Sequence, residues 1–297
     1  MNSLYRMLGW QESSFDDYRQ AYAIFGGSVL SDPRILQFIH RRFNLNERYF
    51  IKRDRANEIV GGVCVWDNHF VAGDQRVACK HGIDRYPLNF DELVLPIKLS
   101  HSTVLPFRTK FLSNLNQCAL RNSSHLLNAR REVSIVRDVS AKTRSSRNRE
   151  LNKFLKAGGS VHCVSEYDHE SLMNTYAELY FQRRNQRIDM DTTRELLSEI
   201  PDLMFGHILA FNGEPCAMQW VVKSEDHRQV YLDYINAGMN LSLSHLSVGT
   251  LAAWVNVRAA LEYGERHQKQ VRFSFGRPTG DYKERWCDRE PLYRVIA

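Results

Sequence analysis

Polar side chains follow an apolar strand near the end of the chain, where residues 273–286 read FSFGRPTGDYKERW. The hydroxyl of Tyr282 is protonated near neutral pH, so it could donate a proton to a thiolate or alkoxide leaving group. Lys283 could place a positive charge on a phosphate or on a leaving-group oxygen. In the alternative interpretation, Tyr282 and Trp286 pack a terminal hairpin and Lys283 is solvated.

A carboxylate also interrupts the apolar strand predicted over 230–235. Strand alternation places Asp233 on one face, together with Tyr231. An aspartate there is costly to bury unless it is paired, which makes Asp233 a candidate base for an acceptor amine if its pKa is raised. It could instead be satisfied by an arginine or by the backbone. His245, in the next loop, is a second candidate base or a polar surface residue.

The residues Ser247-Val248-Gly249-Thr250 open a helix predicted over 247–263. Free N–H groups at a helix start bind anions, and a glycine there allows close approach. We predict that Ser247, Val248, Gly249 and Thr250 bind a cofactor phosphate, together with Lys283. The alternative is an ordinary helix cap.

The elements that must position these residues follow from periodicity and turn signals. Asn212-Gly213 between two apolar runs is a strong hairpin signal. The patterns predict a mixed α/β (α+β) fold, with a largely antiparallel sheet and flanking helices. Predicted helices lie at 15–25, 33–43, 140–156, 168–187, 192–200 and 247–263, and predicted strands at 49–53, 59–66, 93–112, 160–164, 206–211, 217–222, 230–235 and 271–275.

The positive charge of the chain is concentrated in one segment. Residues 121–160 hold ten Lys/Arg and three Asp/Glu, whereas the remainder holds 30 and 31. A helix over 142–156 would present Arg144, Arg147, Arg149 and Lys153 to the phosphates of tRNA or to an anionic membrane surface. It could equally be a solvated face.

Composition excludes several classes of protein. An apolar fraction of 43% and a charged fraction of 25% in 297 residues are globular values. The six cysteines never form a C-x-x-C pair, which favours reduced thiols and predicts no metal site. We find no apolar run long enough to span a bilayer and no signal-peptide pattern, so the sequence predicts a cytoplasmic protein.

The order of elements in the second half resembles the GCN5-related N-acetyltransferase domain, in particular the tandem, FemAB-like transferases. Three stretches carry the resemblance: Arg-x-x-Arg-x-Arg-Glu-Leu closed by Ala-Gly-Gly (144–159), Phe-Asn-Gly-Glu-Pro-Cys-Ala (211–217), and Phe-Ser-Phe-Gly followed by Tyr282-Lys283-x-x-Trp286. The resemblance implies two domains, a degenerate copy over 1–139 and a second over 140–297. It also implies acyl-CoA or aminoacyl-tRNA as the donor, although the usual acetyltransferase fingerprint before the helix is absent.

Over its whole length the chain resembles the macrophage-inducible Mig family (the "fourteen" protein) of Gram-negative bacteria. That resemblance implies resistance to cationic antimicrobial peptides, virulence and attachment to the inner membrane. The leading hypothesis is an acyl- or aminoacyltransferase that modifies an amine or an envelope component. The alternative is a non-enzymatic regulator that binds membrane or nucleic acid, such as a transcriptional activator.

Overall fold

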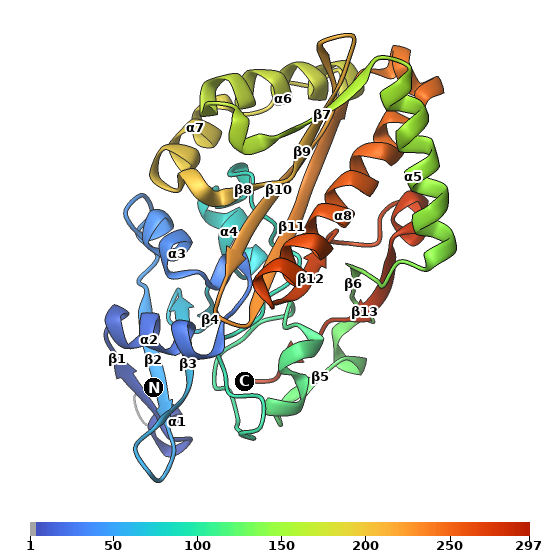
Figure 1. Cartoon of the computed structure of the whole chain (residues 1–297). Coiled ribbons are helices and arrows are strands. Elements are labelled where there is room, and N and C mark those ends of the chain that lie inside the picture. Colours follow the sequence, from blue (N-terminus) through green and yellow to red (C-terminus); the bar gives the residue numbers. More distant parts are fainter. Residues whose placement is uncertain (1–3) are drawn as a thin grey trace.

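The computed structural model describes residues 4–297 and arranges most of them around two sheets (Figure 1). The helices are α1 (Leu4–Met7), α2 (Phe15–Phe25), α3 (Pro33–His40), α4 (Gln75–His81), α5 (Ala141–Lys156), α6 (His169–Arg184), α7 (Met190–Glu199) and α8 (Val248–His267). The strands of the first sheet and of the short pair β5–β14 are β1 (Trp10–Ser13), β2 (Arg48–Arg53), β3 (Ile59–Trp66), β4 (Phe70–Val71), β5 (Ser123–Ser124) and β14 (Arg294–Val295). The strands of the second sheet are β6 (Glu132–Val136), β7 (Gly159–Cys163), β8 (Met204–Phe205), β9 (His207–Phe211), β10 (Glu214–Glu225), β11 (Gln229–Met239), β12 (Gln270–Ser274) and β13 (Cys287–Pro291).

The first sheet has the order β1-β2-β3-β4, and its neighbouring strands are antiparallel. Local sequence explains why helices begin beside it. The hydroxyl of Ser14 accepts the Asp17 amide at the start of α2, and the carboxylate of Asp32 caps α3, whose first residue is Pro33. The helices α2 and α3 therefore begin where the sequence predicts.

The second sheet has the order β13-β6-β12-β11-β10-β9-β7, with β8 on the side of β10. Its strands β9, β10 and β11 form the predicted antiparallel meander. Asn212 and Gly213 make the first turn with φ values of 52° and 86°, which asparagine and glycine tolerate best. The strands β11 and β12 run parallel, and this pairing determines where the candidate site lies.

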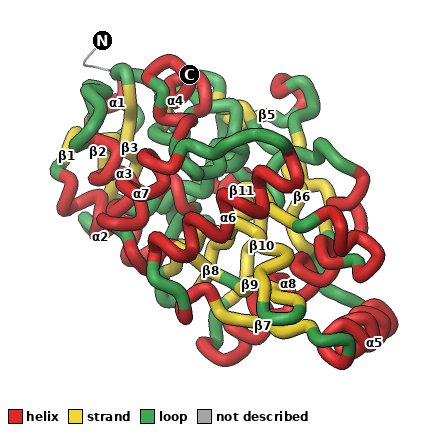
Figure 2. The backbone as a smooth tube through the Cα atoms, turned by 90° about the horizontal axis from the view of Figure 1, so that it is seen from above, coloured by secondary structure: helices red, strands yellow, loops and turns green. Residues whose placement is uncertain are grey.

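Helices cover both faces of the second sheet (Figure 2). On one face, α6 packs with Trp220 of β10 in the large core that also contains the first sheet. On the other face, α8 packs in a second core with Trp254 and Phe273. The helix α5 lies at the edge of the molecule and buries Leu151 and Phe154 in that second core.

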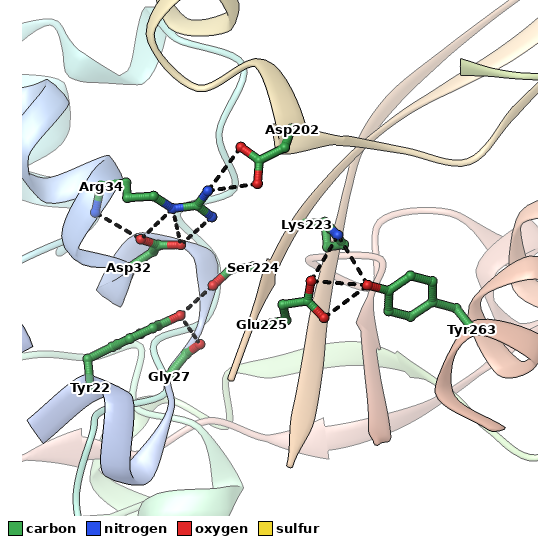
Figure 3. Close-up of polar contacts among 9 residues, drawn as sticks. All are labelled: Tyr22, Gly27, Asp32, Arg34, Asp202, Lys223, Ser224, Glu225 and Tyr263. Atoms are coloured by element: carbon green, nitrogen blue, oxygen red, sulfur yellow. Dashed lines mark hydrogen bonds and ion pairs between the residues drawn. The ribbon is translucent and has the colours of Figure 1, made fainter. Parts of the chain in front are cut away.

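Polar contacts join the first half of the chain to the second sheet (Figure 3). The buried hydroxyl of Tyr22 donates to the Gly27 carbonyl over 3.1 Å and also bonds the hydroxyl of Ser224 in β10. Arg34 bridges Asp32 and Asp202, with nitrogen–oxygen distances of 2.9 and 2.8 Å. These contacts hold the two halves together, and the division into domains at residue 140 stays a prediction.

A second polar cluster ties the end of β10 to α8 (Figure 3). The carboxylate of Glu225 accepts hydrogen bonds from Lys223 at 3.1 Å, Lys269 at 2.7 Å and the Tyr263 hydroxyl at 3.0 Å. Burial opposes ionisation, but hydrogen bonds from the two lysines lower the pKa of Glu225 to about 2. The cluster therefore contains an ionised carboxylate at neutral pH.

The fold contains elements that were not predicted, among them α4, β1, β6 and β13, and the predicted helix 33–43 ends at His40. Three further differences have a physical reason. Residues 93–112 form no regular strand and are held by isolated bridges such as Leu93 to Leu112, because the prolines at 96 and 106 interrupt any ladder. The strand β11 continues to Met239, beyond the predicted end at 235. The helix α8 continues past Gly264, where an added Cβ would lie 2.5 Å from a Val271 methyl group, so this glycine permits close packing and does not end the helix.

Candidate functional site

The two parallel strands of the second sheet separate at their carboxyl ends. Pairing between β11 and β12 runs from Gln229–Gln270 to Asp233–Ser274, where β12 ends and β11 continues to Met239. A register shift opposite Trp220 and Val221 adds an extra residue to β11 at this point, and such a bulge bends a strand. The carboxyl ends of parallel strands are a common place for ligands.

A cavity of about 380 Å³ lies at this opening, and we call it the first cavity. Its walls come from the carboxyl-terminal part of β11, the start of α8, the end of α6 and the turn after β12. The lining residues are Arg183, Gln219, Tyr234, Ala237, Met239, Ser244, Ser247, Val248, Gly249, Thr250, Ala253, Tyr282, Arg285 and Trp286. The cavity therefore lies beside the start of α8.

The start of α8 forms one wall of the first cavity. Ser247 has a left-handed conformation, with φ 56°, and its side chain makes no capping hydrogen bond. The ordinary helix cap considered in the sequence is therefore not found at this end. The Thr250 amide donates to the Ser247 carbonyl at 2.9 Å. The amides of Val248 and Gly249 come before it, where the first amides of a helix carry partial positive charge, so these two are suited to an anion.

Gly249 lies close to the Met239 side chain at the end of β11. A Cβ at this position would lie 2.7 Å from the Met239 Cε atom and 3.1 Å from its Sδ atom. A side chain at this position would displace the end of Met239 or narrow this part of the cavity. The four residues predicted for phosphate binding, Ser247 to Thr250, thus lie together at the cavity wall, and their binding role stays a prediction.

Two arginines that the sequence reasoning missed also line the first cavity. Arg183, near the end of α6, donates to the Ala237 carbonyl at 2.7 Å and to the Asn236 amide oxygen at 3.3 Å. These bonds hold its guanidinium at the wall. Arg285 lies in the same run as Tyr282 and could have been noticed there, whereas nothing in the sequence connects Arg183 with β11.

A pair of tyrosines occupies the wall next to the opening. The hydroxyls of Tyr282 and Tyr234 lie 3.5 Å apart, and Tyr282 is 40% exposed whereas Tyr234 is buried. Burial, with a smaller contribution from Tyr282, raises the pKa of Tyr234. Tyr234 therefore keeps its proton near neutral pH, and its hydroxyl can donate a hydrogen bond.

Asp233 lies outside the first cavity. It alternates with Tyr234 along β11, so its carboxyl points to the opposite face, toward the first half of the chain. Burial raises the pKa of Asp233 well above its usual range, the carboxylates of Glu92 and Asp91 raise it further, and Arg272 opposes them. The raised pKa favours the protonated form of this carboxyl, and its role as a base stays a prediction.

Arg272 is the cation that opposes the rise in the pKa of Asp233. It is paired with two other acidic residues. Its guanidinium bonds Glu92, with an Nε–Oε2 distance of 3.2 Å, and Glu290 at 2.9 Å. Both Arg272 and Glu92 are buried. The buried charge beside Asp233 is therefore neutralised by an ion pair in which Asp233 takes no part.

His245 and Lys283 also lie away from the lining of the first cavity. His245 is exposed on the 3-10 turn Leu241–Leu246. Lys283 is buried and donates to the carbonyls of Phe275 and Arg277, at 2.5 and 2.6 Å, and burial lowers its pKa. Lys283 therefore holds the turn after β12 together, and the roles predicted for both residues stay untested.

The basic helix α5 contacts the same region from outside. The Trp254 indole of α8 donates to the Asn148 side chain at 3.0 Å, which ties the two helices together. Arg147 pairs with Glu150 at 2.5 Å, and its guanidinium lies 5.8 Å from the ring of Trp286, which lines the first cavity. The remaining predicted basic residues, Arg144, Arg149 and Lys153, are exposed.

Within residues 4–297, no helix combines the length and apolar character needed to cross a membrane. The same residues contain no cluster of three or more His, Cys, Asp or Glu side chains that could hold a metal ion.

Comparisons with solved structures identify the fold. The crystal structure of FemX has 9% sequence identity and a TM-score of 0.56, and the alignment covers 97% of each chain. L-PGS from Bacillus licheniformis has 12% identity over 96% of this chain and 92% of its own, with a TM-score of 0.48. A tandem GNAT protein from the clavulanic acid biosynthesis pathway has 10% identity over 96% and 97%, with a TM-score of 0.41. The likeness to FemX confirms the predicted mixed α/β fold.

No curated protein matches this chain in sequence. A model of the Mig-14 family does match it, over residues 32–295. Because that match spans most of the sequence, the chain belongs to the Mig-14 family, as its resemblance predicted.

Proposed function

We propose that this protein transfers an acyl or aminoacyl group from a phosphate-bearing donor in the first cavity to an amine. The observation that carries the proposal is the opening between β11 and β12, which the uncapped start of α8 faces. Arg183 and Arg285 add positive charge to the same walls. Acyl-CoA and aminoacyl-tRNA both carry phosphates that such a site would bind.

The tyrosine pair supplies the proton that the reaction needs. The amine nitrogen forms a bond to the donor carbonyl carbon, and the bond from that carbon to the leaving sulfur or oxygen breaks. Tyr282 gives its hydroxyl proton to the leaving atom, and the proton lost by the attacking nitrogen returns to the tyrosine pair. Asp233 and His245 remain predicted bases, but the first cavity itself offers Tyr282 and Tyr234.

The basic surface of α5 is suited to a partner that is rich in phosphate, either an RNA donor or a membrane. Arg144 and Arg149 line a shallow depression on α5, and Arg147 connects that helix to Trp286 in the first cavity. An RNA bound on α5 could therefore place its acylated end in the cavity. Charge reversal at Arg144 and Arg149 is expected to weaken RNA binding and to reduce its dependence on salt.

A second surface supports peripheral attachment to an anionic membrane, as expected from the family resemblance. Leu126 and Leu127 are 80% and 60% exposed beside the exposed residues Arg121, Arg130 and Arg131. The surrounding segment, residues 93–131, contains six Lys/Arg and no Asp/Glu. Exposed leucines flanked by arginines are suited to a bilayer surface with anionic lipids. Sedimentation with anionic vesicles should decrease in the Leu126→Ser/Leu127→Ser variant.

Thermal shift and a resistance assay test the transferase together. Coenzyme A, acetyl-CoA and an aminoacyl-tRNA are added separately, because a ligand that binds only the folded protein raises its melting temperature. We expect one donor class to stabilise the wild type and the Tyr282→Phe variant alike. Tyr282→Phe should abolish survival of expressing cells exposed to a cationic antimicrobial peptide, since only the proton donor is lost.

The competing function is a regulator that binds membrane or nucleic acid without catalysis. That protein would keep resistance after Tyr282→Phe and would lose it on charge reversal at Arg144, Arg147 and Arg149. No melting shift with any of the three ligands, together with full resistance of Tyr282→Phe, would contradict the transferase.

A further inference from the structure

A buried glutamine lies in the wall of the first cavity, and the reaction described above gives it no role. Gln219 belongs to β10, opposite Ala237 of β11, and it is only 3% exposed. Both residues line the first cavity. Because buried polar groups in folded proteins nearly always have partners, both ends of this side-chain amide require one.

Neighbouring groups determine which end of the Gln219 amide faces the cavity. The backbone N–H of His207 donates to the Oδ1 atom of Asn256 in α8 at 2.8 Å, and a backbone N–H can only donate. The other end of the Asn256 amide, Nδ2, is therefore its donor, and it donates to the Oε1 atom of Gln219 at 3.0 Å. Since the oxygen of Gln219 faces Asn256, its NH2 group points away from Asn256.

The groups that hold Gln219 are themselves enclosed. Asn256 has no exposed surface. The backbone approaches it at Gly206, which has a φ of +112° and where a Cβ would lie 2.4 Å from the Asn256 Oδ1 atom, so a glycine is required there. The Gln219 amide cannot rotate without breaking its bond to a buried partner, and its NH2 group is therefore fixed in direction.

The Nε2 donor of Gln219 is free and can be reached. Within residues 4–297, the one hydrogen bond of this side chain is the bond that its oxygen accepts. Its Nε2 atom keeps some exposed surface, unlike the fully enclosed and unpartnered Nε1 atom of the next residue, Trp220. Because Gln219 lines the first cavity, that surface opens into it. A fixed N–H donor is suited to a ligand oxygen and unsuited to an ammonium, which can only donate.

The free donor and the start of α8 lie along the same side of the cavity. Gly249, Ala253 and Asn256 are spaced by four and three residues, so they share one face of α8, and the first two line the first cavity. At 1.5 Å of rise per residue, Asn256 lies about 10 Å farther along the helix than Gly249. The wall therefore offers an anion site at the start of α8 and, farther along the helix, a neutral hydrogen-bond donor.

We propose that the side-chain amide of Gln219 binds the carbonyl oxygen of the group that the donor transfers. This inference rests on the proposed function, since it positions the reacting carbonyl of the same donor. A carbonyl next to a phosphate-bearing carrier is common to acyl-CoA and aminoacyl-tRNA. His207 and Asn256 act as positioning residues, because they present the NH2 group of Gln219 to the cavity.

The hydrogen bond from Gln219 acts on the atom where charge develops. When the amine nitrogen bonds to the carbonyl carbon, the carbonyl oxygen gains negative charge, and the Nε2–H group of Gln219 donates to it without losing its hydrogen. When the bond from that carbon to the leaving sulfur or oxygen breaks, the carbonyl is restored. A donor fixed in advance stabilises such an oxygen without reorganising during the reaction.

Ligand pairs that differ at the carbonyl test this inference by calorimetric titration of the full chain. One pair is acetyl-CoA and S-ethyl-CoA, in which a methylene replaces the carbonyl, and the other is an aminoacyl-tRNA and the same tRNA deacylated. We expect one pair to bind, with the carbonyl ligand preferred. That preference should fall by about 3- to 10-fold in Gln219→Met, which keeps the side-chain length and loses the donor. The control Gln20→Met, at an exposed position of α2, should keep it.

A second variant tests the orientation of Gln219 without changing a residue that contacts the ligand. In Asn256→Asp, one carboxylate oxygen accepts from His207 and the other requires a donor. Gln219 should therefore turn its NH2 group toward the aspartate and its oxygen toward the cavity. The preference for the carbonyl ligand should be lost in this variant too. If neither variant folds, the side-chain amide signal of Gln219 in the 15N-labelled wild type serves instead, because the carbonyl ligand must shift it.

The outcomes separate this inference from the proposed function. No binding of any of the four ligands would contradict the proposed function and this inference with it. Equal binding of both members of a pair by the wild type would overturn this inference alone, because the donor site would remain. The same holds if Gln219→Met keeps the full preference for the carbonyl ligand, or if that ligand leaves the Gln219 amide signal unmoved.

Discussion

Acidification should destabilise the protein through one histidine at the end of α3. The Nε2 atom of His40 accepts the Trp66 indole N–H at 2.8 Å, and its Nδ1 atom lies 2.8 Å from the Tyr49 hydroxyl. An indole nitrogen is only a donor, so Nε2 must be unprotonated and the folded state holds a neutral ring. Burial lowers the pKa of His40 from 6.5 to about 4, although Glu47 acts in the opposite direction.

The sign and size of the effect follow from linkage. The pKa of His40 is lower in the folded state, so as the pH falls from 6.5 toward 4 only the unfolded chain takes up the proton. The stability contributed by the neutral ring is therefore fully present above pH 6.5 and is lost over that range. Each tenfold change in proton affinity is worth about 1.4 kcal/mol. The free energy of unfolding should therefore fall by about 2 kcal/mol between pH 7 and pH 5 from this group alone, and by about 3 kcal/mol below pH 4.

Urea unfolding of the wild type and of His40→Gln at pH 7 and pH 5 measures this loss. Glutamine can accept from Trp66 and donate to Tyr49, but it does not titrate, so carboxylate contributions cancel in the comparison. The wild type should lose about 2 kcal/mol more than His40→Gln over this range. The control His245→Gln removes an exposed imidazole. Equal losses in the wild type and His40→Gln, or a pKa near 6.5 for His40 by NMR, would refute the reasoning.

Three further outcomes concern packing and buried charge. Gly264→Ala should lower the free energy of unfolding by about 1–3 kcal/mol, since the new methyl lies 2.5 Å from Val271; equal stability by urea unfolding would contradict this. Arg272→Met should lower the free energy of unfolding by about 3–5 kcal/mol, because Glu92 is left buried and unpaired. The double variant Glu92→Gln/Arg272→Met should recover part of that loss. Glu225→Gln should reduce the free energy of unfolding at pH 7. The wild type loses the stability contributed by the ionised Glu225 as the pH falls from 4.5 toward 2, because its pKa is lowered in the folded state, and the variant should show a flatter decline there. Parallel pH profiles of the two proteins would argue against the cluster.

Much of the fold could be predicted because its signals are local. Ser140 accepts the Thr143 amide at the start of α5, and Asn212-Gly213 makes its hairpin turn wherever the strands lie. Local signals failed where packing overrides them. An apolar, proline-containing run at 93–112 was mistaken for strands, and Gly264 was mistaken for a helix end although it is required for contact with β12.

The candidate site was predicted only in part. The residues 247–250 and Tyr282 were singled out by their types, and both line the first cavity. Alternation along β11 correctly separated Asp233 from Tyr234, but it cannot tell which face of a strand meets a cavity. Arg183 lies far from these residues in sequence, and no spacing rule connects it with them.

The amino-acid sequence by itself determined the helices, the hairpins, the basic segment and the membership of a family, because these depend on neighbours along the chain. The tertiary structure alone decided where β11 and β12 part, and which side chains meet there. The physical reason is that a cavity is formed by the packing of segments distant in sequence. Its charge and its free hydrogen-bond donors exist only after those segments have come together.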